Sequence, residues 1–163
     1  MHILPTAYLI SGFVGCSLAA ALSDAQTLRI SNSLSGAILL LFGVYALISL
    51  SPAQTVTALA MAGATLLIGF AAFVRGWLGG GDAKLLAVCM AWAGTSHATE
   101  FLIVTGLSGG VIALALRSNL TAPLADRLRR NWPGTAAEAQ ASMPYGVAIA
   151  AGAVAIAFEM MPS

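Results

Sequence analysis

Long apolar stretches separated by short polar segments make up most of this chain. One stretch covers residues 3–22, and residues 30–74 contain no charged side chain. Because a helix that crosses the hydrocarbon core needs about 20 apolar residues, the second stretch can hold two spans, which the polar segment 49–55 separates. The stretches lack the polar face, repeated every 3.6 residues, that helices of a soluble bundle show. The pattern predicts an all-α membrane protein with six transmembrane helices, over residues 3–22, 34–50, 55–74, 83–98, 101–116 and 144–161.

Composition and charge agree with this class of protein and narrow its chemistry. Of the 163 residues, 59% are hydrophobic and 8% are charged, and the mean hydropathy is +0.90, whereas a soluble domain carries about 25% charged residues. The formal net charge is +1 and no long basic tract occurs, so nucleic acid is not an expected partner. Cys16 and Cys89 lie in apolar stretches and are interpreted as small buried side chains. We expect neither a metal site nor a cofactor.

The basic residues gather in alternate connections between the predicted helices. Six of the seven Lys and Arg residues lie in the loops 23–33, 75–82 and 117–143, and Lys84 follows the second loop closely. Because cytoplasmic loops are enriched in Lys and Arg, the pattern predicts that the N-terminus lies outside and that these three loops lie on the inner face. The long loop 117–143 is either an amphipathic segment on the inner leaflet or a polar connector.

Two acidic residues share the inner end of the predicted bundle. Asp24 ends the first predicted span and Asp82 begins the fourth, so the two carboxyl groups can meet if these spans pack together. Taken singly, each has a structural explanation. Asp is a favoured N-cap residue, and Asp82 lies where the fourth span would begin. A charge at the membrane interface is also much less costly than one in the middle of the bilayer. Three glycines at 79–81 precede Asp82, however, and they let the backbone leave helical geometry and be approached closely.

A carboxyl pair beside an irregular backbone is the arrangement of an aspartyl protease. Irregular backbone at membrane depth is tolerated only where it is packed in protein or lines a wet cavity. Two carboxyl groups in contact do not both ionise readily. One would stay charged and take a proton from water, and the other would stay protonated and donate to the scissile carbonyl oxygen.

Three short segments resemble the motifs of one known family. Residues 79–85 read Gly-Gly-Gly-Asp-Ala-Lys-Leu and match the GxGD-x-K-L motif of type IV prepilin peptidases, which are intramembrane aspartyl proteases. In that family the other Asp ends the first span and precedes Ile-Pro-Asn. Here Asp24 precedes Ile30, Ser31 and Asn32, with Ser in place of the usual Pro. Residues 144–147, Pro-Tyr-Gly-Val, resemble the Pro-Tyr-Gly-Pro of the family, so the resemblance extends from the first predicted span to the last.

The resemblance implies a function and a set of site residues. Asp24 and Asp82 would be catalytic. The residues implied to support the active site are Gly79, Gly81, Lys84, Ile30, Asn32, Pro144, Tyr145 and Gly146. Larger members carry a methyltransferase region, often with a CxxC pair, and this chain has neither, so it is similar to the short, peptidase-only members associated with Tad/Flp pili.

We therefore expect a single polytopic peptidase domain over residues 1–163, without a methyltransferase domain. It would be an endopeptidase that cleaves the leader of type IV (Tad/Flp-type) prepilins and pseudopilins at the cytoplasmic face of the bacterial inner membrane. Its expected partners are the prepilin leader and apolar helix, the lipid bilayer and the pilus assembly machinery.

Two other functions compete with this interpretation. Paired membrane aspartates also serve proton-coupled transporters, in which ionisable groups lie near the middle of the bilayer or in both halves of a pathway. A non-catalytic pilus assembly factor would keep the fold without a working carboxyl pair. Lys84 has two interpretations as well: it attracts acidic substrate residues or tunes the pair, or it reaches towards the inner headgroups.

Overall fold

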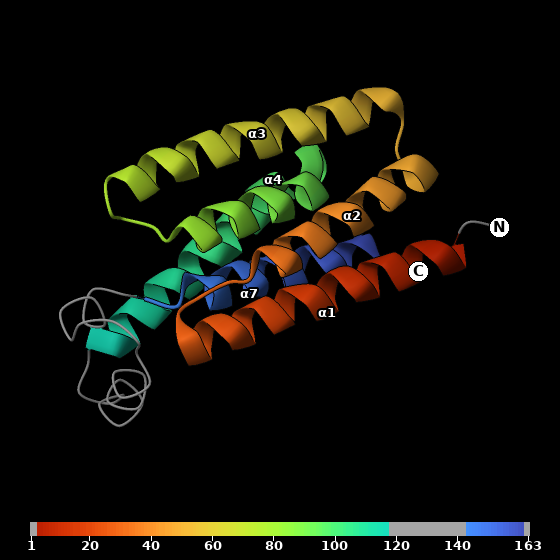
Figure 1. Ribbon diagram of the computed structural model, residues 1–163. Helices are drawn as coiled ribbons and strands as arrows, with labels where there is room; N and C mark the ends of the chain where they lie inside the picture. The colour runs from red at the N-terminus through yellow and green to blue at the C-terminus, as the bar shows by residue number, and fades with distance from the viewer. Residues whose placement is uncertain (1–2, 118–142, 162–163) are drawn as a thin grey trace.

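A computed structural model describes residues 3–117 and 143–161 as an all-helical bundle (Figure 1). These residues form five helices and no strand: α1 (Ile3–Thr27), α2 (Asn32–Ser49), α3 (Pro52–Val74), α4 (Gly80–Arg117) and α7 (Tyr145–Met160). Serine side chains begin two of them, since Ser31 caps α2 and Ser51 forms a capping box with Gln54 at the start of α3. The all-α class expected from the sequence is thus confirmed.

The helix α4 contains a reversal of the chain. Gly94 has φ 54° and ψ −155°, which is not a helical conformation, and the residues on either side of it are helical. Both ends of α4 lie at the same end of the bundle, so residues 80–93 and 95–117 run antiparallel (Figure 1). Glycine adopts this backbone conformation, whereas side-chain-bearing residues almost never do.

The expectation of six spanning helices is not supported. By length and composition, four helices of the described residues could cross a membrane: Leu4–Thr27, Asn32–Ser49, Pro52–Val74 and Gly80–Ala115. The predicted spans 83–98 and 101–116 both fall within α4, and the predicted break between residues 98 and 101 is helical. The chain reverses earlier because Gly94 adopts a left-handed φ, and an apolarity pattern does not register such a turn.

The expected inner loops are also corrected. The helix α1 continues through Thr27 and α4 begins at Gly80, so the connections are residues 28–31 and 75–79 rather than 23–33 and 75–82. Asp24 and Asp82 therefore lie in terminal helical turns, not in loops. The amphipathic or connecting segment expected within 117–143 lies, apart from its two end residues, outside the described residues.

Aromatic and small side chains hold the helices together. Trp92 of α4 stacks between Phe13 of α1 (ring centroids 4.5 Å apart) and Tyr45 of α2 (5.0 Å), and its Nε1 donates to the carbonyl of Ile38 at 3.1 Å. The helix α7 is rich in alanine and glycine and packs against both α1 and α4. Because small side chains allow close approach of helices, α7 lies inside the bundle, and its first turn reaches the end of α1 (Figure 1).

The reversal at Gly94 leads to a stability prediction. Gly94→Ala places a side chain on a backbone with φ 54°, and we expect the free energy of unfolding to fall by about 1–3 kcal/mol. Gly63→Ala is the matched control, because Gly63 is helical and a Cβ there would meet nothing within 4 Å. The control should leave stability unchanged or raise it slightly. Unfolding in detergent, followed by circular dichroism, measures both; equal stabilities for the two variants would contradict the prediction.

Candidate active site

Asp24 and Asp82 lie in one pocket at one end of the bundle. Asp24 is in the last turn of α1 and Asp82 in the first turn of α4, and their exposed fractions are 3% and 7%. The pocket has a volume of about 300 Å³ and is lined by Asp24, Leu28, Arg29, Ile30, Gly79, Gly80, Gly81 and Asp82. The two carboxyl groups are close enough to interact electrostatically. Packing of α1, α4 and α7 thus brings together two acids that are 58 residues apart.

A backbone N–H group from the far end of the chain binds Asp24. The amide of Gly146, in the first turn of α7, donates to Asp24 Oδ2 at 2.7 Å. A Cβ at residue 146 would lie 2.9 Å from both the Cβ and Oδ2 of Asp24, so only glycine permits this approach. Pro144 is buried and precedes the helix as its N-cap, and Tyr145 is half-buried. Of the three residues in the Pro-Tyr-Gly segment, Gly146 therefore makes the contact with Asp24.

The two oxygens of the Asp82 carboxyl group have different surroundings. The backbone of Gly79 approaches one oxygen of this carboxyl group closely, because a Cβ at residue 79 would lie 2.5 Å from Asp82 Oδ2. The other oxygen, Oδ1, is buried and has no hydrogen-bond partner among the described residues. A buried acceptor without a partner is unfavourable, so Oδ1 has an unmet capacity to accept a hydrogen bond.

Ile30, in the short connection between α1 and α2, contacts the glycine that precedes Asp82 and the glycine that binds Asp24. Ile30 lies against Gly81, where an added Cβ would be 3.1 Å from Ile30 Cβ, and against Gly146, where it would be 3.0 Å from Ile30 Cδ1. Ser31, which stands where the family has a proline, caps α2 by accepting a hydrogen bond from Ser33 N–H at 3.2 Å. The serine therefore has a structural role at the start of α2.

Lys84 and Asn32 meet beside the pocket. Lys84 Nζ donates to Asn32 Oδ1 at 2.9 Å, and both residues are exposed. Arg29 lines the pocket too, although from the sequence it had indicated only the inner side of the membrane. Ser23 Oγ donates to the Arg29 carbonyl at 2.8 Å, and Leu28 has φ 51°. Arg29 directly precedes Ile30, a residue of the family motif. This adjacency was the sequence feature that could have identified Arg29 as a pocket residue.

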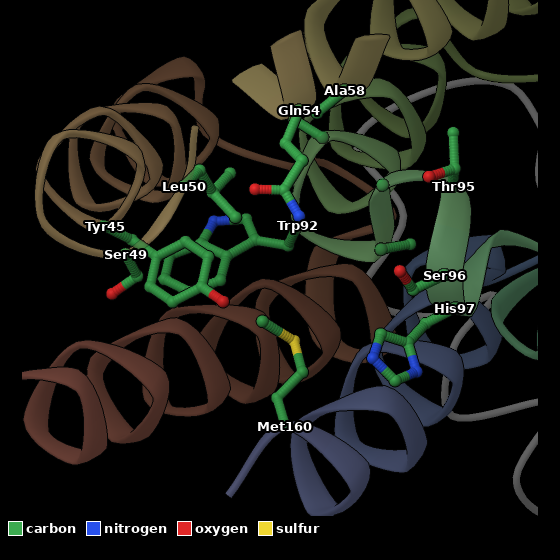
Figure 2. A pocket seen from close by; sticks show the side chains of 13 residues that line it. Tyr45, Ser49, Leu50, Gln54, Ala58, Trp92, Thr95, Ser96, His97 and Met160 are labelled. Atoms are coloured by element: carbon green, nitrogen blue, oxygen red, sulfur yellow. The ribbon is translucent and has the colours of Figure 1, made fainter. Parts of the chain in front are cut away.

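A second pocket lies at the opposite end of the bundle and carries different chemistry (Figure 2). Its volume is about 290 Å³, and it lies where α2 ends, α3 begins and α4 reverses. Polar groups from Gln54, Thr95, Ser96 and His97 face it, but no carboxylate lines it. Within residues 3–117 and 143–161, no group of three His, Cys, Asp or Glu side chains could hold a metal ion. The carboxyl pair is therefore the stronger candidate for a reactive centre.

The fold and the carboxyl pair define a class of protein, and a family follows from the sequence. Several helices are apolar enough to cross a membrane, and two acids lie buried at one end of the bundle, as in a polytopic membrane protein with a carboxyl site. Residues 11–114, more than half of the chain, match the type IV leader peptidase family, and the chain belongs to this family. Membership implies a peptidase and confirms the expected resemblance. No curated protein and no solved structure shows significant similarity to the chain.

Proposed function

We propose that this chain is an intramembrane aspartic endopeptidase that removes the leader from type IV prepilins and pseudopilins. The observation that carries the proposal is the buried pair of Asp24 and Asp82, which share a pocket and interact electrostatically. Membership in the leader peptidase family supports the substrate class. The unpartnered Oδ1 of Asp82 supports a role for that oxygen in contact with water or the scissile bond.

The proposed chemistry needs only the two carboxyl groups and one water molecule. One carboxylate takes a proton from the water, whose oxygen then bonds to the scissile carbonyl carbon. The other, protonated, carboxyl donates to the carbonyl oxygen, and a tetrahedral intermediate forms. The first carboxyl group next donates the proton it took from water to the peptide nitrogen, and the second carboxylate takes back a hydroxyl proton of the intermediate as the C–N bond breaks. A leader carboxyl group and a new amino terminus result, and both carboxyl groups return to their starting protonation states. The Gly146 N–H holds Asp24 in place during these steps.

The proposed setting is the cytoplasmic face of the bacterial inner membrane. Arg29 lines the pocket and Arg75 ends α3 at the same end of the bundle, which is the side that the positive-inside rule assigns to the cytoplasm. The leader would enter the pocket while the apolar helix of the prepilin lies in the bilayer. The proposal also includes a Tad/Flp-type pilin as the substrate and the pilus assembly machinery as a partner. It further includes a single peptidase domain over residues 1–163.

The described residues favour neither competing function. A proton-coupled transporter needs ionisable groups along a path through the membrane. The buried core of the described residues is mainly apolar and includes Phe13, Phe42, Leu85 and Trp92. A non-catalytic assembly factor would have the same fold, so only an assay separates it from a peptidase.

The purified protein should cleave a prepilin at a single bond. In detergent micelles or liposomes, we expect a shortened pilin whose new amino terminus lies just before the apolar helix, identified by mass spectrometry. The control is the same prepilin incubated with protein that has been unfolded by heat. A prepilin that stays intact beside folded protein would contradict the proposed function.

A further inference from the structure

Two residues from separate family motifs form a hydrogen bond with each other next to the pocket. Lys84 Nζ donates to Asn32 Oδ1 at 2.9 Å across 52 positions of sequence. Lys84 lies two residues after Asp82 in the first turns of α4, and Asn32 is the first residue of α2. The bond therefore connects the start of α2 to the helical turn that carries one of the two acids.

The acceptor of this bond argues against an ammonium group that merely reaches towards lipid headgroups. A lysine in that role keeps its charged end in water or at headgroups, whereas Lys84 Nζ is bound to a side-chain amide of another helix. The amide oxygen is neutral, so the bond fixes the position of Lys84 without cancelling its charge. Asn32 thus holds a cation at a defined place two residues from Asp82.

The helical turn around Asp82 is held by apolar contacts and by the hydrogen bond between Lys84 and Asn32. Ala83 packs on Gly69 of α3, where an added Cβ would be 3.0 Å from the Cβ of Ala83, and Gly81 lies against Ile30. These are apolar contacts and have little directional preference. The bond between Lys84 and Asn32 is directional, so it resists rotation of the turn and displacement along Ile30.

We propose that the hydrogen bond between Lys84 and Asn32 positions Asp82 relative to Asp24, which makes Lys84 and Asn32 positioning residues of the peptidase. The inference rests on the proposed function. Neither residue touches the scissile bond in this scheme. Both act through the location of the Asp82 carboxyl group, and a displacement of about 1 Å can lower a rate by about 100-fold.

A double-mutant cycle on prepilin cleavage tests this role. Asn32→Leu and Lys84→Met should each lower kcat by about 10-fold to 100-fold, with KM nearly unchanged. The double variant should be no slower than either single variant, because the two residues act through one bond. Lys84→Arg and Asn32→Asp retain donor and acceptor and should keep most of the activity. Ser33→Ala is the matched control, an exposed neighbour in the same turn of α2, and should behave as the wild type.

Other outcomes would overturn the inference. If Lys84→Met raises KM at unchanged kcat while Asn32→Leu has no effect, Lys84 recruits acidic substrate residues and positions nothing. Additive losses in the double variant would likewise exclude a shared bond. Because both side chains are exposed, each variant should unfold at the wild-type temperature; if Asn32→Leu does not, Asn32→Ala replaces it in the cycle. Failure of the wild-type protein to cleave prepilin would instead refute the proposed function.

Discussion

Replacing either Asp24 or Asp82 by asparagine is expected to lower prepilin cleavage by about 10²–10⁴-fold, the range that a positioned acid or base contributes. Asparagine keeps the size of the side chain but cannot exchange a proton at neutral pH. The effect should be found in kcat rather than in KM, because the carboxyl groups act on the water and the carbonyl oxygen. Single-turnover cleavage of a labelled prepilin, measured for each variant, gives the rate of the chemical step.

The two acid substitutions should also fail to add. If the carboxyl groups work as a pair, the double variant will be about as slow as the slower single variant. Glu159→Gln is the matched control, because Glu159 is an exposed carboxylate near the other end of α7, and its rate should equal that of the wild type. Protein stability should hold or rise in the Asp variants, since burial of a charge is unfavourable. Wild-type cleavage by Asp82→Asn would refute the mechanism.

The second large effect is expected at Gly79, with its neighbour Gly80 as the control. A Cβ at residue 79 would lie 2.5 Å from Asp82 Oδ2, so the carboxyl group has to move away from its present position. A Cβ at residue 80 would find the Phe73 ring at 3.4 Å, an ordinary contact distance. Neither glycine has a positive φ, so the two substitutions differ in this contact rather than in backbone strain.

Gly79→Ala should therefore lower kcat by about 100-fold, as misplacement of a catalytic group does, while stability changes little. The carboxyl end of Asp82 can rotate aside, so folding tolerates the substitution better than catalysis does. Gly80→Ala should lose much less activity. The comparison requires kcat from prepilin cleavage and unfolding temperatures in detergent for both variants. Equal losses at the two positions would show that the contact with Asp82 is not the cause.

The positions of most helices could be predicted because the membrane interior forces each apolar segment to form its backbone hydrogen bonds within itself. An apolar run of sufficient length must satisfy its own backbone hydrogen bonds, so it forms a helix where it stands. The predicted spans 34–50 and 55–74 accordingly match α2 (Asn32–Ser49) and α3 (Pro52–Val74) to within three residues at each end. Family membership could be predicted for a similar reason, since Gly79 to Leu85 form an uninterrupted motif that needs no knowledge of contacts.

The reversal within α4 and the contacts at the site depended on the tertiary structure. A single glycine, Gly94, turns the chain through a left-handed φ inside an apolar run, and nothing in hydropathy distinguishes it from the helical glycines of α4. Similarly, the sequence predicted that Asp24 and Asp82 lie at the same membrane face, but their shared pocket depends on which helices pack side by side. The amide of Gly146 reaches Asp24 because α7 is small enough to lie inside the bundle.

Residue types and spacing in this chain thus determined its helical class, its membrane character and the chemical groups available for a reaction. Helix formation depends on interactions between residues that are close in sequence, so the local sequence is sufficient to predict it. The meeting of Lys84 with Asn32, the glycine contacts of Ile30 and the unpartnered oxygen of Asp82 were decided by packing between helices. Such contacts join positions dozens of residues apart, and their geometry depends on all the side chains that lie between the helices.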